Sequence, residues 1–265
     1  MEYTYKFLNI PYWKVVWFNK NKNFIPKDWC LYTLRQSVKL DIPKKYIIFE
    51  NEFYTTVIDL TKDLDEIWYK FDKKSTRYEI KKAMKFIDKI RILENENYEQ
   101  FFKMGNEYYF LKYGINKKFN ITEILSKKRN HYLLLAYYDN DLICGAFYIY
   151  DSKKERIRLN YSFSKYLFGK EYSHISSFLN KYLHWYAIQK FKNEGFKLYD
   201  FGGINLNKNS KTYGITKFKL SFGGDIVKEY DYLIHKKGCI LRQIINNHIL
   251  RNLVVKLPIK KPIYG

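Results

Sequence analysis

The stretch from Tyr199 to Asp225, YDFGGINLNKNSKTYGITKFKLSFGGD, contains the residues whose types and spacing could most readily do chemistry. It holds five of the chain's 12 glycines, including two Phe-Gly-Gly triplets. Gly202 and Gly203 would let the backbone pass close to a ligand, and Lys219 could face a cleft where two strands part. By pattern alone, the glycines fit equally a tight exit from a sheet, and Lys219 fits a surface charge.

The elements that would position this stretch follow from periodicity and from turn residues. Asp63 is a plausible cap for one helix, and Ser75 for a second. Further helices are predicted at about 98–109, 116–127, 173–194 and 212–221, and strands at 55–60, 131–138, 142–150, 155–163, 196–201 and 226–234. Short polar turns at 139–141 and 151–154 predict an antiparallel meander. The order predicts an α/β protein of the α+β type, with a mixed, mostly antiparallel central sheet flanked by helices.

Composition and charge limit the classes of protein. The 265 residues carry 48 Lys and Arg against 27 Asp and Glu, a net charge of +21 that would attract polyanions. The excess of Lys, Asn, Ile, Tyr and Phe equally fits codon bias in an AT-rich genome. The three cysteines lie far apart, which argues against a zinc site, and no metal is expected. The sequence shows no signal peptide and no apolar run long enough to span a membrane, so we expect a cytoplasmic protein. Peripheral contact with the anionic inner face of the membrane is a further expectation.

Familiar catalytic signatures do not occur in the sequence. There is no GxSxG, HExxH or GxxxxGK[ST] pattern, and the five histidines form no motif. His184 lies in the middle of the predicted long helix beside Trp185, where a packing histidine is a better interpretation than a catalytic base.

Three stretches resemble the FemABX family of peptidoglycan-bridge aminoacyltransferases, which belongs to the GNAT superfamily. The first, 55–85, contains Arg77, Ile80, Lys82, Ala83 and Lys85 in the family's "R..I.KA.K" pattern. The second, 178–204, ends in YDFGGI, and the third, 213–232, is similar to the family's "GI..FK..FGG..V.Y" segment. The resemblance covers about 55–235.

The resemblance implies a GNAT-like fold and transfer of an aminoacyl group from aminoacyl-tRNA to an amine of a cell-envelope precursor. The lysine of the family's "FK" pair corresponds to Lys219, which is the implied catalytic residue. Its ammonium would stabilise the oxyanion formed when the amine attacks the carbonyl. Substrate contacts are expected from Phe218, Lys217, Asp200, Gly202, Gly203 and Tyr161. No cofactor is implied, because the aminoacyl-tRNA is a co-substrate. Asp200 is also a candidate base, although a structural role is the preferred interpretation.

The sequence departs from the family in its N-terminal region. Residues 1–54 could hold only a strand-rich remnant of the first of two GNAT-like domains, 55–235 would be the acyltransferase domain, and 236–265 a basic amphipathic tail. The tail would lie on anionic lipid or, the preferred interpretation, pack on the body.

Two other functions stay open. One is tRNA-independent N-acyl transfer from acyl-CoA or acyl carrier protein to an amino sugar, although the acetyl-CoA loop pattern is missing after 155–163. The other is a non-catalytic RNA- or membrane-binding module.

Overall fold

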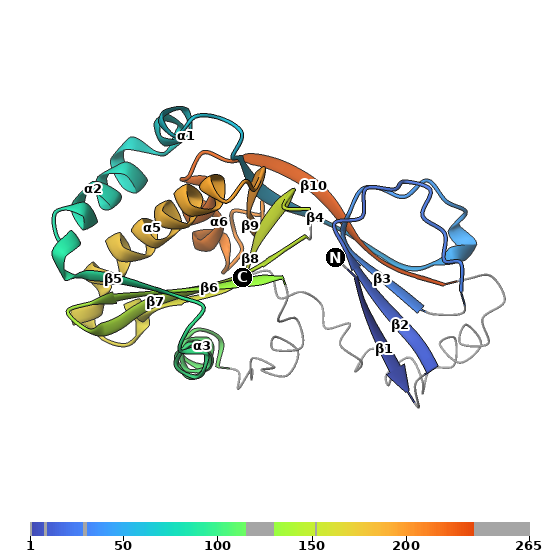
Figure 1. Cartoon of the computed structure of the whole chain (residues 1–265), viewed down its shortest axis with the longest axis horizontal. Coiled ribbons are helices and arrows are strands. Elements are labelled where there is room, and N and C mark those ends of the chain that lie inside the picture. The colour runs from blue at the N-terminus through green and yellow to red at the C-terminus, as the bar shows by residue number, and fades with distance from the viewer. Residues whose placement is uncertain (1, 8–9, 29–30, 115–129, 152, 236–265) are drawn as a thin grey trace. The chain divides into compact units, whose positions relative to one another are not determined.

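The computed structural model describes residues 2–7, 10–28, 31–114, 130–151 and 153–235 (Figure 1). Two compact units are distinguished by their internal contacts. The first combines residues 2–55 with 203–216 and 226–235, and the second combines 56–202 with 217–225, within the described ranges. The predicted helix at 116–127 and the predicted tail, 236–265, lie outside the described residues.

The first unit is built on strands. Its strands are β1 (Glu2–Phe7), β2 (Ile10–Trp17), β3 (Leu31–Ser37), β4 (Ile47–Asp59) and β10 (Asp225–His235), with a 3₁₀ turn η1 (Lys44–Tyr46). Parts of β4 and β10 belong to the second unit. The strands are ordered β1-β2-β3-β10-β4. β1 pairs antiparallel with β2, β2 parallel with β3, and β3 antiparallel with β10. Apolar residues of β3 and β10, including Leu34 and Ile234, form its core.

The second unit contains the predicted meander. Its strands are the end of β4, β5 (Ile90–Glu94), β6 (His131–Tyr138), β7 (Asp141–Tyr150), β8 (Arg156–Ser164) and most of β9 (Leu198–Ile204), in the order β4-β9-β8-β7-β6-β5. β5 to β8 pair antiparallel, and β8 pairs parallel with β9. Asp139 and Asn140 both have positive φ, as a tight β6–β7 hairpin requires. The predicted fold class, a mixed and mostly antiparallel sheet flanked by helices, is confirmed.

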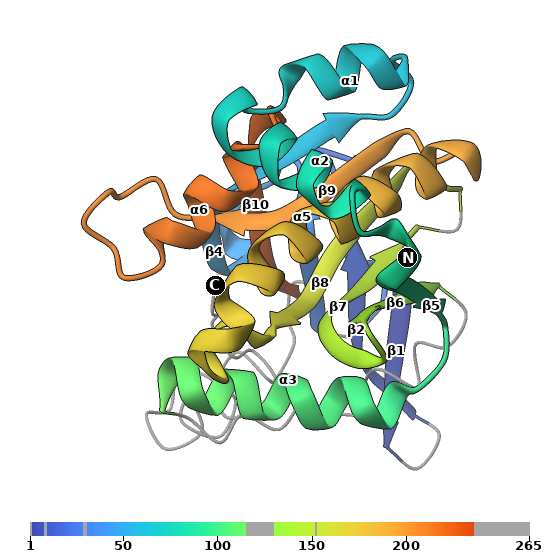
Figure 2. The same ribbon diagram turned by 90° about the vertical axis from the view of Figure 1, so that its left-hand side faces the viewer.

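Helices cover both faces of this sheet. They are α1 (Leu64–Lys70), α2 (Tyr78–Met84), α3 (Tyr98–Tyr113), α5 (Lys170–Asn193) and α6 (Tyr213–Leu220), with the short turns η2 (Lys73–Arg77), η3 (Ile87–Lys89) and η4 (Lys165–Leu167). Figures 1 and 2 show α5 on one face of β6–β8, α2 outside it, and α3 across the opposite face. α5 follows from apolar residues at helical spacing, among them Leu179, Leu183 and Phe191, all fully buried.

Three local features differ from the sequence prediction. The side chain that caps the segment before α2 is Asp72, which accepts from the Ser75 N–H at 2.7 Å; Ser75 itself lies inside η2. β4 begins eight residues earlier than the predicted strand, at Ile47. The edge strand β5 was not predicted, because its five residues are only half-buried and do not alternate clearly.

Candidate active site

The region around Lys219 begins where β8 and β9 part. Their parallel pairing covers Arg156–Arg158 and Leu198–Asp200, and beyond it β8 continues to Ser164 and β9 to Ile204. The β7–β8 register shifts where Phe147 faces Tyr161 and Tyr148 faces Leu159, which leaves Asn160 as the extra residue of a bulge. Bulges bend a strand and are common beside functional sites, so this irregularity marks the position where β8 turns away from β9.

Asp200 is held at the point of separation. Its carboxylate is fully buried and accepts from Arg156 Nη2 at 2.7 Å and Nε at 3.0 Å, while the Gly202 N–H donates to the other oxygen at 2.7 Å. Arg158 Nε lies 3.8 Å away. A carboxylate with this many donors is a poor proton acceptor, which favours a structural role over that of a general base. Gly202 has a φ of +76°, so the turn itself favours glycine.

Lys219 is buried, in contrast to a surface charge. It lies near the end of α6, and only 7% of its surface is exposed. Its pKa is lowered to about 7, first by burial and then by the positive charges of Arg158 and Lys112, while Asp200 acts in the opposite direction. Burial also lowers the pKa of Lys112 to about 8. An amine in this state is held away from water yet close to its titration point at neutral pH.

A buried polar chain lies next to Lys219. His184 Nδ1 is 2.6 Å from the Tyr199 hydroxyl, which is 3.0 Å from the Tyr148 hydroxyl. Burial and the charge of Lys219 lower the pKa of His184 to about 3, so the imidazole is neutral. His184 is therefore buried and hydrogen-bonded, as the preferred interpretation of the sequence predicts. Its lowered pKa is also partly caused by the nearby charge of Lys219.

The other residues predicted to contact substrate differ in burial and in the element that carries them. Phe218 packs against the His184 ring, with centroids 5.6 Å apart, and against Phe222 at 5.5 Å. Lys217 is exposed on α6. Tyr161 lies on β8, 6.4 Å from the ring of Phe147. Gly203 is buried on β9 directly after Gly202.

Arg156, Arg158 and Lys112 were not singled out from the sequence. Arg156 and Arg158 are two residues apart on a predicted strand, and this spacing places both side chains on the same face of the sheet. That spacing was a usable signal for a basic face. Lys112 gave no such signal, because its proximity to the site depends on how α3 packs on β8.

The second Phe-Gly-Gly triplet serves close packing. A Cβ on Gly223 would lie 2.2 Å from the carbonyl oxygen of Lys70, and a Cβ on Gly224 would lie 2.7 Å from that of Val57. Gly223 also has a φ of +66°. These glycines let the turn after α6 lie against α1 and β4.

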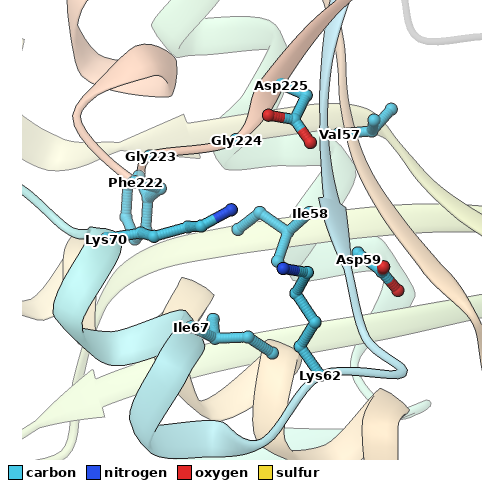
Figure 3. Close-up of a pocket in the computed structure, with 10 residues that line it drawn as sticks. All are labelled: Val57, Ile58, Asp59, Lys62, Ile67, Lys70, Phe222, Gly223, Gly224 and Asp225. Carbon is cyan, nitrogen blue, oxygen red and sulfur yellow. The ribbon is translucent and has the colours of Figure 1, made fainter.

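A shallow hollow beside this turn is a different feature from the Lys219 site. Its volume is about 240 Å³ when the adjoining open solvent is included, and its lining includes Lys62, Lys70, Asp59 and Asp225. Figure 3 shows the lysines extending into the hollow from α1 and the preceding turn, with the two carboxylates from β4 and the start of β10 at its sides. Lys62 is paired with Glu66, and this pairing raises the pKa of Lys62. The balanced charges of the hollow make it a poor anion site, and Lys219 does not line it.

The described residues show neither a metal centre nor a membrane-spanning helix. They contain no group of three or more His, Cys, Asp or Glu side chains placed to hold a metal ion. None of the helices in the described part of the chain is long and apolar enough to cross a membrane.

The comparisons with known proteins agree with the sequence resemblance. Residues 159–235 match the FemAB family, and this range includes Asp200, Lys219 and both Phe-Gly-Gly triplets. No curated protein matches the sequence. The predicted resemblance to FemABX proteins is thereby confirmed for the C-terminal part of the described chain.

Solved structures share the fold. FemX is 14% identical with a TM-score of 0.53, and the match covers 73% of this chain and 64% of FemX. The C-terminal domain assigned to a lysylphosphatidylglycerol synthetase of Agrobacterium fabrum is 12% identical with a TM-score of 0.52, covering 85% of this chain and 72% of that domain. The chain thus matches somewhat less than two thirds of FemX. The structural matches show a shared fold, and the FemAB match over residues 159–235 supports the expectation of an acyltransferase.

Proposed function

We propose that this chain, which matches the FemAB family over residues 159–235, transfers an aminoacyl group from aminoacyl-tRNA to an amine of a peptidoglycan precursor or a related cell-envelope glycan. The observation that carries the proposal is the burial of Lys219 at the family's lysine position, beside the point where β8 and β9 part. A basic residue without a role would be expected in water, because burying an ammonium is costly.

The reaction requires little from the protein beyond position and charge. The acceptor amine attacks the ester carbonyl of the aminoacyl-tRNA, a C–N bond forms, and the tetrahedral intermediate carries an oxyanion. The C–O bond to the terminal ribose then breaks, and the proton lost by the amine is returned to the ribose oxygen. In its charged form, Lys219 would stabilise the oxyanion more than the ground-state carbonyl, which is the condition for catalysis.

The neighbours of Lys219 fit this role. The backbone around Gly202 is the close-approach element expected to contact substrate, and Phe218 would anchor α6 against His184. Asp200 would hold Arg156 and the turn at Gly202 in place through its hydrogen bonds. Tyr161 and Lys217 remain proposed contacts with substrate. No residue is assigned as the base, so the amine is proposed to react in its neutral form.

The test is transfer of a labelled amino acid from purified charged tRNA to lipid-linked and nucleotide-linked precursors, with acyl-CoAs assayed in parallel. We expect transfer from charged tRNA, a loss of about 100-fold or more in Lys219→Ala, and weaker donor binding as salt rises. Lys211→Ala, an exposed lysine of the polar loop, is the matched control and should keep the wild-type rate.

The alternatives give different results in the same assay. Transfer from an acyl-CoA to an amino sugar, without tRNA, would favour the tRNA-independent acyltransferase. Binding of RNA with no turnover by any donor would favour the non-catalytic module. A wild-type rate in Lys219→Ala would remove the role proposed for this lysine.

A further inference from the structure

The outer surface of α1, η2, α2 and η3 combines exposed apolar side chains with positive charge. We call it the α1–α2 surface, and it comprises the exposed residues of 69–89. Its large apolar side chains are between 36% and 71% exposed: Tyr69, Tyr78, Met84, Phe86 and Ile87. A soluble surface usually carries such side chains singly, so five within 19 consecutive residues require an explanation.

The same range concentrates basic residues. It contains eight Lys or Arg and three Asp or Glu, and therefore a net charge of +5. One of the acidic residues, Asp72, is engaged locally, because its carboxylate caps η2 through the Ser75 N–H. The field outside this surface is therefore positive, and the partner that fits it carries negative charge.

The inner side of α2 supplies the buried contacts that hold this helix on the body. Ile80 and Ala83 on the inner side of α2 are fully buried, and α2 packs on α5. Tyr78, Lys81 and Lys85 recur every three or four residues on the outer side, next to Met84. The outward side of α2 thus carries both lysine and apolar side chains.

We propose that the α1–α2 surface binds the surface of an anionic lipid bilayer, with Met84 and Ile87 at the level of the acyl chains and lysines among the phosphate headgroups. Three of the five exposed apolar side chains are aromatic and fit either partner. The aliphatic Met84 and Ile87 favour lipid over RNA, because single-stranded RNA is held by stacking on aromatic rings and by cationic grooves. Membrane surface binding combines buried apolar area with attraction to anionic lipid, and this surface supplies both.

The surface is joined directly to the helix that carries Lys219. Thr76 Oγ1 lies 2.6 Å from Ser221 Oγ, and the Asp72 N–H donates to the Ser221 carbonyl at 2.8 Å. Ser221 follows Lys219 by two residues. Binding at η2 and α2 would therefore hold the end of α6 near the bilayer. If the proposed function holds, this places the reaction next to a lipid-linked acceptor.

Co-sedimentation of the full chain with vesicles tests the proposal. The protein should bind vesicles of phosphatidylglycerol and phosphatidylcholine in equal parts far more tightly than vesicles of phosphatidylcholine alone, and salt should weaken the binding. Lys81→Gln/Lys85→Gln should weaken binding on the order of 25-fold, at roughly fivefold for each lysine. Met84→Ser/Ile87→Ser should weaken it by about tenfold or more, because inserted apolar area is lost.

Matched controls distinguish vesicle binding by this surface from vesicle binding through the overall positive charge of the chain. Lys208→Gln/Lys211→Gln removes the same charge from the exposed polar loop, and Leu206→Ser removes an exposed apolar side chain there. Both controls should keep at least half of the wild-type affinity. Equal losses in controls and surface variants would overturn the proposal, as would unchanged binding in the surface variants.

A tRNA gel-shift experiment with the same variants addresses the competing partner. If the Met84→Ser/Ile87→Ser and Lys81→Gln/Lys85→Gln variants lose tRNA affinity but keep vesicle affinity, the surface binds RNA and the membrane proposal is wrong. Vesicle binding requires neither donor nor acceptor, so Lys219→Ala should bind vesicles as wild type does. Failure of the proposed enzyme activity is thereby distinguishable from failure of this inference.

Discussion

His184 and Tyr199 form a short, fully buried hydrogen bond, with Nδ1 and the hydroxyl oxygen 2.6 Å apart. Because the imidazole is neutral, Nδ1 accepts from Tyr199 when the ring hydrogen is on Nε2. The ring that this bond orients is packed against Phe201, Phe218 and Phe222, at centroid distances of 5.2, 5.6 and 5.7 Å. The pair therefore fixes the aromatic support of α6 one residue before Lys219.

Replacing Tyr199 by Phe should lower the free energy of unfolding by about 1–3 kcal/mol. The variant leaves Nδ1 buried with only the Tyr148 hydroxyl nearby, at 3.4 Å. Denaturant unfolding measures the change, and Tyr69→Phe, which removes an exposed hydroxyl, should stay within about 0.5 kcal/mol of wild type. Equal stability of the two variants would show that the His184–Tyr199 bond contributes nothing net.

The pH dependence of transfer should report the titration of Lys219. If the ammonium form stabilises the oxyanion, kcat/KM calculated from the concentration of neutral acceptor amine should fall as pH rises through about 7, the pKa of Lys219 in the free protein. Lys219→Arg keeps its charge throughout and should move this falling limb upward by two pH units or more, at a lower maximal rate. A blank without enzyme corrects for hydrolysis of the aminoacyl ester. A falling limb that stays at the same pH in Lys219→Arg would assign it to another group.

Arg158 offers a second test of the same electrostatics. Its positive charge lowers the pKa of Lys219, although burial is the larger cause. Arg158→Met should therefore move the falling limb to higher pH, but by less than Lys219→Arg does. The charged groups that act on Lys219 also include Asp200 and Lys112, so Lys112→Met should shift the limb in the same direction. A shift to lower pH in either variant contradicts this account.

Stability should depend on pH through the same lysine. The pKa of Lys219 is lower in the folded protein than in the unfolded chain, so between about pH 7 and 10.5 the unfolded chain binds more protons. This group therefore makes the protein more stable as pH rises through that window, and its penalty is complete below pH 7. Lys219→Met should be more stable than wild type at pH 6 by a few kcal/mol, and the difference should shrink by pH 10. Thermal unfolding at both values measures it, and a difference that does not change with pH would contradict the assigned pKa.

Sequence periodicity predicted most of the second unit but not the electrostatics of its site. The meander and α5 were predictable because apolar residues such as Leu179 and Leu183 recur at helical spacing and Asp139-Asn140 marks a hairpin. The burial of Lys219 was not predictable from the sequence, because a lysine on a short helix is expected to be exposed unless the surrounding fold is known. Its identification depended on family resemblance. Its lowered pKa depends first on burial and then on Arg158 and Lys112, which come from β8 and α3. The edge strand β5 was missed because a half-buried strand has little periodicity.

Two glycines near Lys219 should respond oppositely to replacement by alanine. A Cβ at Gly223 would lie 2.2 Å from the Lys70 carbonyl oxygen, and its φ of +66° is unfavourable for alanine. We expect Gly223→Ala to lose about 2–4 kcal/mol of unfolding free energy, since backbone cannot move aside as a side-chain tip does. Gly214 lies in α6 with nothing within 4 Å of an added Cβ, so Gly214→Ala should gain about 0.5–1 kcal/mol.

Thermal unfolding at one pH compares these two variants directly, at roughly 2–4 °C for each kcal/mol in a chain of this size. Gly223→Ala should also separate the turn after α6 from α1, because the added Cβ would collide with the Lys70 carbonyl oxygen. Proteolysis under native conditions should then cut the α6–β10 connection faster in Gly223→Ala than in Gly214→Ala. If both variants unfold at the wild-type temperature, the close approach of Gly223 to Lys70 does not constrain the fold, and the second Phe-Gly-Gly triplet needs another explanation.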